Sequence, residues 1–135
     1  MPTEQELFGL MVRLVRSVQR KADALHRDDT ITPARFFVLA SLQTQGPLAQ
    51  KDIAEQMGAT AANVSQLVSA LEGLGLVSRR REGTTNFVSL TDAGADVVED
   101  VRPRHAEFMS GVFSALSEED FQTLHRLLRA LEDEL

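Results

Sequence analysis

Residues 47–91 read PLAQKDIAEQMGATAANVSQLVSALEGLGLVSRRREGTTNFVSLT, and this stretch decides the fold. A short helix is expected from about Ala49 to Met57, with Gly58 closing it and Ile53, Ala54 and Met57 facing inward. Thr60 then predicts the N-cap of a longer helix, which Gly73 and Gly75 end. Its apolar side is made of Ala61, Val64, Leu67 or Val68, Leu71 and Leu74.

Two β-prone runs follow that longer helix. Leu76 to Arg81 and Phe87 to Leu90 flank the polar, glycine-containing loop Glu82 to Asn86, which indicates a β-hairpin over about 77–90. A short helix, a tight turn, a longer helix and a hairpin in this order are typical of a winged helix-turn-helix. The expected fold is therefore mostly α-helical, with a small β-hairpin wing.

On the N-terminal side, two helices are expected. Thr3 and Glu6 form a capping-box pattern before a stripe of Leu7, Met11, Leu14, Val18, Ala22 and Leu25, so a long first helix should end near Asp28 and Asp29. Thr32-Pro33 then starts a helix that stops at Gly46-Pro47. This helix is expected to bury Phe36 or Phe37, Leu39, Ala40 and Leu42.

On the C-terminal side, Thr91 caps a helix that carries Ala93, Val97, Val101, Phe108 and Val112 on its apolar face. Pro103 should bend this helix or split it. Ser117 and Asp120 cap a last helix whose alternating three- and four-residue spacing is typical of a helix that packs along another helix.

The 135 residues fit one domain, with a winged helix-turn-helix at 32–91 flanked by helical regions at 1–31 and 92–135. One winged helix cannot cover the apolar stripes of both end regions, so we expect a second copy of the chain to cover them. The residues expected to form this homodimer interface are Leu7, Met11, Leu14, Val18, Phe121, Leu124, Leu128, Leu131 and Leu135.

The composition excludes several classes of function. The chain has no cysteine, and its three histidines are scattered, so we expect no disulfide, metal site or other cofactor. No nucleophile–base arrangement or phosphate-binding glycine loop is found, so we do not expect an enzyme. Without a signal peptide or an apolar run near the roughly 20 residues of a membrane span, we expect a cytoplasmic protein that does not enter a membrane.

The longer helix of residues 60–75 has an outer face of short and amide side chains. Such a face can enter the major groove, about 12 Å wide, and Asn63 and Gln66 each carry a donor and an acceptor suited to adenine. Arg79, Arg80 and Arg81 are suited to phosphates or to the minor groove, although strand alternation places Arg80 on the opposite face. The candidate DNA-binding residues are Thr60, Ala62, Asn63, Ser65, Gln66, Ser69, Arg79, Arg80, Arg81, Thr84, Thr85 and Asn86.

The formal net charge of −6 does not favour DNA by itself, but the acidity is uneven. Residues 92–135 carry 11 acidic and 4 basic side chains, whereas residues 47–91 carry 4 of each. The central region is therefore free to present a basic edge.

The ordered pieces of the sequence resemble the MarR family of bacterial regulators. They are Thr32-Pro33-Ala34-Arg35-Phe36 with Leu39, Gly46-Pro47-Leu48, Gln50 to Ala54, Val64 to Val68, Leu71-Glu72, Gly75-Leu76-Val77 and Val88 to Gly94. The resemblance implies a dimer whose first and last helices interlock, with a winged helix at each end. It also implies repression at a palindromic operator in double-stranded DNA, relieved by a small, often aromatic, ligand.

The chain departs from this family at functional positions. Ala49 stands where a Ser or Thr cap is common, Gln66 and Ala70 stand where Arg is frequent, and the short wing lacks the family's Asp-x-Arg. Arg79 matches the arginine at the base of the wing but lacks its customary acidic partner. The main hypothesis is a homodimeric, sequence-specific, ligand-responsive repressor. The alternative is a winged-helix protein-interaction module that has lost DNA binding.

Overall fold

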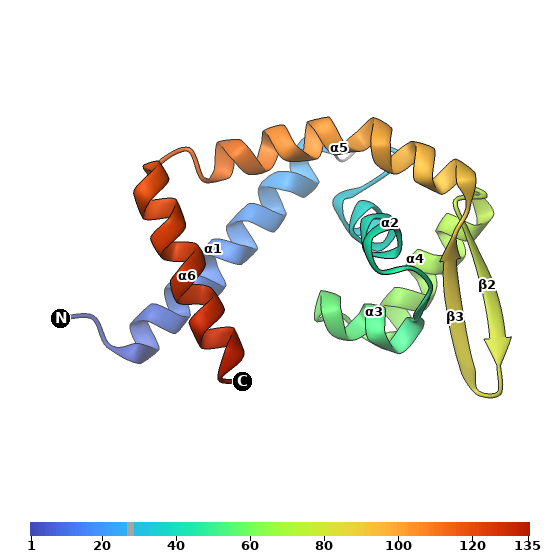
Figure 1. Cartoon of the computed structure of the whole chain (residues 1–135), viewed down its shortest axis with the longest axis horizontal. Coiled ribbons are helices and arrows are strands. Elements are labelled where there is room, and N and C mark those ends of the chain that lie inside the picture. The colour runs from blue at the N-terminus through green and yellow to red at the C-terminus, as the bar shows by residue number, and fades with distance from the viewer. Residues whose placement is uncertain (27–28) are drawn as a thin grey trace. The chain divides into compact units, whose positions relative to one another are not determined.

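The computed structural model describes residues 1–26 and 29–135 (Figure 1). Its contacts divide the chain into two compact units, Met1–Arg102 and Pro103–Leu135, each described separately below. The helices are α1 (Glu4–Leu25), α2 (Pro33–Gln45), α3 (Gln50–Met57), α4 (Ala61–Gly73), α5 (Asp92–Val112) and α6 (Glu118–Asp133). The strands are β1 (Leu48–Ala49), β2 (Val77–Glu82) and β3 (Thr85–Leu90). The predicted fold class, mostly helical with a small wing, is confirmed.

Three helices of the first unit begin where side-chain caps were expected. Thr3 and Glu6 form both hydrogen bonds of a capping box at α1, and Thr32 Oγ1 accepts from the Arg35 amide at α2. Thr60 Oγ1 accepts from the Asn63 amide at α4. Helix α1 ends at Leu25, with His26 as its C-cap. Of the predicted end near Asp28 and Asp29, Asp29 lies beyond the helix and Asp28 lies outside the described residues.

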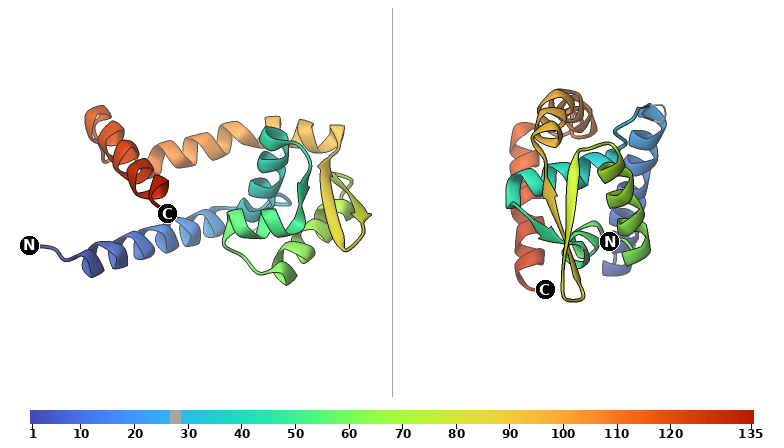
Figure 2. Two further views of the ribbon diagram at one scale, coloured as in Figure 1. Left: turned by 60° about the horizontal axis from the view of Figure 1, so that its bottom comes forward. Right: turned by 90° about the vertical axis from the view of Figure 1, so that its right-hand side faces the viewer.

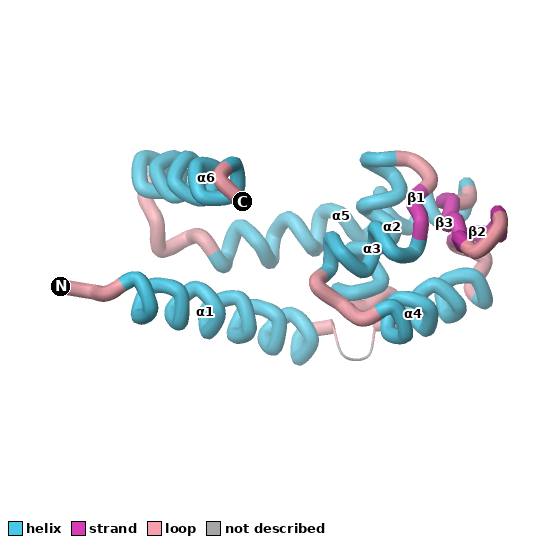
Figure 3. Tube along the Cα trace, turned by 90° about the horizontal axis from the view of Figure 1, so that it is seen from below, coloured by secondary structure: helices cyan, strands magenta, loops and turns pink. Residues whose placement is uncertain are grey.

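The sheet has three antiparallel strands in the order β1-β3-β2 (Figure 3). Strand β2 pairs with β3 from Val77↔Leu90 to Glu82↔Thr85, which places the hairpin at 77–90. The sequence reading missed β1 and started a helix at about Ala49, where the structure shows Ala49 paired with Phe87. Ala49 is extended and buried, so its backbone groups join the sheet and α3 begins one residue later, without a side-chain cap.

The core of the first unit joins α2, α3, α4, the sheet and the first half of α5. Phe36 is buried and Phe37 is exposed, which resolves the alternatives left open for α2. On α4, Val64, Val68 and Leu71 are fully buried, whereas Leu74 is exposed. The core residues are Phe36, Val38, Leu39, Leu42, Ile53, Ala54, Val64, Val68, Leu71, Leu76, Val77, Val88, Val98 and Val101.

Helix α5 rules out one of the two outcomes predicted for Pro103 and differs from its prediction at the start of its apolar face. It continues through Pro103 as one helix, so the proline does not split it. Its buried face begins with Gly94 rather than Ala93, because the helix start lies against the Leu76 carbonyl, where only glycine leaves room. The Thr91 hydroxyl caps this start, accepting from the Gly94 amide and donating to the Gly75 carbonyl.

Candidate nucleic-acid interface

Helix α4 turns a polar, sterically small face to solvent. Ala62, Asn63 and Gln66 are exposed on it, and Thr60 is exposed at its N-terminus. The predicted contact residue Ser65 is half-buried and therefore lies at the edge of this face. Because no large side chain stands between Asn63 and Gln66, both amide groups can approach the edges of bases.

The turn between α3 and α4 is fixed by backbone geometry. Gly58 adopts the left-handed conformation, with φ 64° and ψ 32°, as is common for glycine at the end of a helix. The Ala59 amide donates to the Ala54 carbonyl at 3.0 Å, which closes the last turn of α3. The start of α4 is thus held at a set angle to α3, as in a helix-turn-helix.

The hairpin extends away from α2, α3 and α4, so its tip stands clear of them (Figures 1 and 2). Arg80 is exposed, forms a 3.0 Å ion pair with Glu82 and lies over the Phe87 ring at 5.9 Å. Arg81 Nε donates to the Gly83 carbonyl at 3.1 Å. At the tip, Thr84 is exposed, whereas Thr85 and Asn86 are half-buried. Arg80 and Arg81 are the two basic groups that the distal wing presents to solvent.

Arg79 points toward α4 rather than toward solvent. Its Nη2 donates to Ser69 Oγ at 2.6 Å and lies 3.8 Å from Glu72 Oε1. The structure therefore brings two predicted DNA-binding residues, Ser69 and Arg79, into contact with each other. The sequence reading missed Glu72, Glu82 and Phe87 as partners of the arginines. Ser69 and Glu72 are spaced i, i+3 and therefore lie on one side of α4, but nothing in the sequence indicates that this side faces Arg79.

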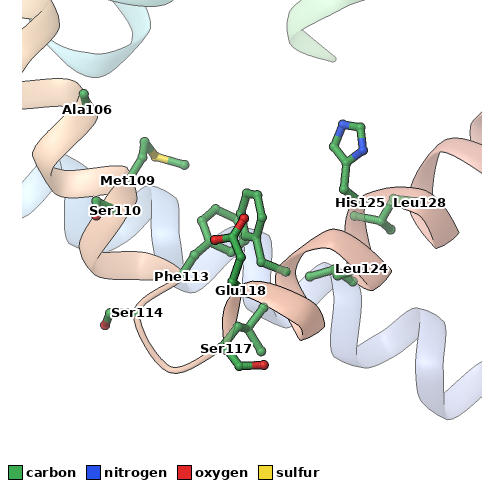
Figure 4. A pocket seen from close by; sticks show the side chains of 12 residues that line it. Ala106, Met109, Ser110, Phe113, Ser114, Ser117, Glu118, Leu124, His125 and Leu128 are labelled. Atoms are coloured by element: carbon green, nitrogen blue, oxygen red, sulfur yellow. The ribbon is translucent and has the colours of Figure 1, made fainter.

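The second unit contains an apolar cavity of about 660 Å³ between the end of α5 and α6 (Figure 4). Met109, Phe113, Phe121, Leu124 and Leu128 line it, and the rings of Phe113 and Phe121 meet edge to face at 5.6 Å. No residue of α6 is buried. Of the predicted interface residues on α6, Phe121, Leu128 and Leu131 are exposed and Leu124 is half-buried.

Two other features are absent from the described part of the chain. Residues 1–26 and 29–135 contain no group of three or more His, Cys, Asp or Glu side chains suited to hold a metal ion. Among the same residues, no helix combines the length and apolar character needed to cross a membrane.

Comparison with known proteins agrees with this geometry. Residues 31–83 match the model of the MarR family. An uncharacterized HTH-type transcriptional regulator of Bacillus cereus is 32% identical over 124 residues, which span 88% of this chain and 84% of the relative. The HTH-type transcriptional repressor MdtR of Bacillus subtilis is 36% identical over 93 residues, 67% of this chain and 60% of the relative.

A solved structure also matches along its whole length. The MepR–DNA complex of S. aureus superposes with a TM-score of 0.73 at 26% identity, covering 100% of each chain. The family match, the relative aligned over most of both chains and the winged helix-turn-helix geometry agree. The chain therefore belongs to the MarR family of winged helix-turn-helix transcriptional regulators.

Proposed function

We propose that this regulator represses transcription as a homodimer bound to a palindromic operator, with α4 of each copy in the major groove. The observation that carries the proposal is the exposed pair Asn63 and Gln66 on the open side of a helix capped by Thr60. Support for DNA as the ligand comes from MepR, which was solved in complex with DNA. The repressor role is supported by the description of MdtR as a repressor.

The residues of the interface divide into two roles in this proposal. Thr60, Ala62, Asn63, Ser65 and Gln66 face the bases, because they lie on or beside the outer face of α4. The distal wing holds the sugar–phosphate backbone, which positions the protein without reading sequence. Its contacts are Arg80, Arg81, Thr84, Thr85 and Asn86.

The homodimer is supported by exposed apolar side chains at both ends of the chain. Leu7, Leu14, Leu128 and Leu131 are each more than two-fifths exposed, which is unfavourable for side chains of this size in a soluble monomer. Charge also favours a contact between copies, because residues 13–21 of α1 include four basic and no acidic side chains, whereas the first turn of α6 is acidic. A second copy supplies the two-fold symmetry that paired half-sites require.

A small, aromatic ligand that releases the operator completes the proposal, and the family resemblance alone supports this part. Binding to chromosomal DNA would place the protein in the cytoplasm of a bacterium.

A mobility-shift assay on the DNA upstream of its own gene, at two salt concentrations, tests the DNA-binding proposal. We expect a complex that weakens steeply as salt rises, because phosphate contacts release counterions. Selection of bound sequences with Asn63→Ala and Gln66→Ala should give altered preferences, whereas Gln19→Ala, an exposed change on α1, should not. If no salt-sensitive complex forms at low salt, the proposal is wrong and a protein-interaction module is favoured.

A further inference from the structure

We propose that Arg79 is a positioning residue that fixes the wing against α4, with Ser69 as its hydrogen-bond acceptor and Glu72 as its ion-pair partner, and that it does not contact DNA itself. The inference rests on the proposed DNA-binding function. It assigns to Ser69 and Arg79 a different role from the direct contact that their place in the sequence suggested. Two observations carry it: where the Arg79 guanidinium lies, and how the other wing arginines differ from it.

The guanidinium of Arg79 is held between two elements. Nη2 donates to Ser69 Oγ at 2.6 Å and lies 3.8 Å from a Glu72 carboxylate oxygen. The Arg79 side chain is only 19% exposed, and its Nε is buried without a hydrogen-bond partner among the described residues. A guanidinium in this position cannot reach a phosphate without breaking its contacts to α4, and the Coulombic attraction to Glu72 opposes that step.

The strand pairing places Arg79 near the base of the hairpin, at a level where β3 pairs with both β2 and β1. Arg79 lies opposite Val88, which is fully buried and also pairs with Leu48 of β1. The next level, Arg80 opposite Phe87, is the last one at which β3 also pairs with β1, through Ala49; from Arg81 and Asn86 to the tip, β2 and β3 pair only with each other. The Arg79 contact thus joins α4 to the base of the hairpin, two residues before the part of the wing that pairs only with itself.

Arg80, the next residue on β2, can be compared directly with Arg79. Its side chain is 72% exposed, points to the opposite face of the hairpin and pairs only within the wing, with Glu82 and Phe87. The two arginines therefore have the same charge on the same strand but different surroundings. Arg80 is available to a phosphate, whereas Arg79 joins the wing to the helix that enters the groove.

A double-mutant cycle on operator binding tests the assignment, with unfolding curves to confirm that each variant is folded. We expect Ser69→Ala and Arg79→Met each to weaken binding, Arg79→Met by about tenfold, and the double variant to bind no more weakly than Arg79→Met alone. The dependence on salt should be unchanged in Arg79→Met but should fall by about one unit in Arg80→Met. Additive losses in the cycle, or a fall of one unit in Arg79→Met, would overturn the proposal.

A second measurement needs no DNA, so it separates this inference from the proposed function. The chain has no cysteine, so spin labels can be placed at Thr84→Cys on the wing tip and Ala62→Cys on α4, with labelled chains diluted in unlabelled protein. Distances between the labels should spread more widely in Arg79→Met and Ser69→Ala than in the parent or in Arg80→Met. An unchanged distribution in Arg79→Met would show that the contact does not position the wing, whether or not the protein binds DNA.

Discussion

Gly94, in the first turn of α5, lies against the backbone of Leu76, the residue before β2. A β-carbon at this residue would lie 2.2 Å from the Leu76 carbonyl oxygen and 2.6 Å from Leu90 Cδ1. The Thr91 amide donates to the same carbonyl at 3.1 Å, so backbone contacts fix the first turn of α5 at the base of β2. Only glycine fits at position 94, because the backbone of Leu76 occupies the space that a β-carbon would need.

Substitution of Gly94 by alanine should therefore lower the free energy of unfolding by about 1–3 kcal/mol, since backbone atoms must move to admit the methyl group. Gly111 is the matched control, because it lies in the same helix with open space around its β-carbon position. Gly111→Ala should raise the free energy of unfolding by about 0.5–1 kcal/mol through helix propensity. Urea denaturation measures both changes, and shifts of the same sign would contradict this account.

Among the elements, the wing shows most clearly what the sequence could not predict, namely the partners of its arginines. The three consecutive arginines looked equivalent as a basic run, yet the structure gives each different partners. Arg79 contacts Ser69 and Glu72, Arg80 pairs with Glu82, and Arg81 donates to the Gly83 carbonyl. Strand alternation predicted which arginine faces the opposite side. It could not predict these partners, because they depend on the distance between α4 and β2 in three dimensions.

The helices were more predictable than the short strand. Thr3, Thr32, Thr60 and Ser117 marked the starts of four helices, because a capping side chain acts within three residues of itself. Strand β1 has two residues and depends on pairing with β3, nearly forty residues away, so no local pattern revealed it. The contact between Ser69 and Arg79 was missed for the same reason. The assignment of individual DNA-binding residues remains a prediction.

The ion pair between Arg80 and Glu82 gives a prediction about the wing as an element. Glu82 holds a guanidinium that a phosphate would otherwise bind, so Glu82→Gln should tighten binding to all DNA sequences by a few-fold, the scale of one exposed ion pair. Glu107→Gln makes the same charge change at an exposed position of α5 and should have less effect. Titrations at constant salt measure both, and equal gains would point to net charge as the cause.

For the whole molecule, the main expectation is its oligomeric state. Leu128 is 43% exposed on the apolar side of α6, and Leu128→Glu should convert the proposed dimer to monomers because it would bury a charge in the interface. Thr123→Glu places the same charge on a different side of α6 and should leave the dimer intact. Sedimentation equilibrium measures the masses. A wild-type chain that sediments as a monomer would contradict the dimer.

The pairing of β2 with β3 has a consequence for changes in the length of the wing. The base of the hairpin is fixed by the core, and only Gly83 and Thr84 join the two strands at the tip. Two residues inserted symmetrically at this tip would lengthen the wing and leave every side chain below it on its present face. A single inserted residue would instead create a bulge or shift the pairing of one strand. The reach of this wing can therefore be changed by two residues on the chain at a time without any change in the hydrophobic core.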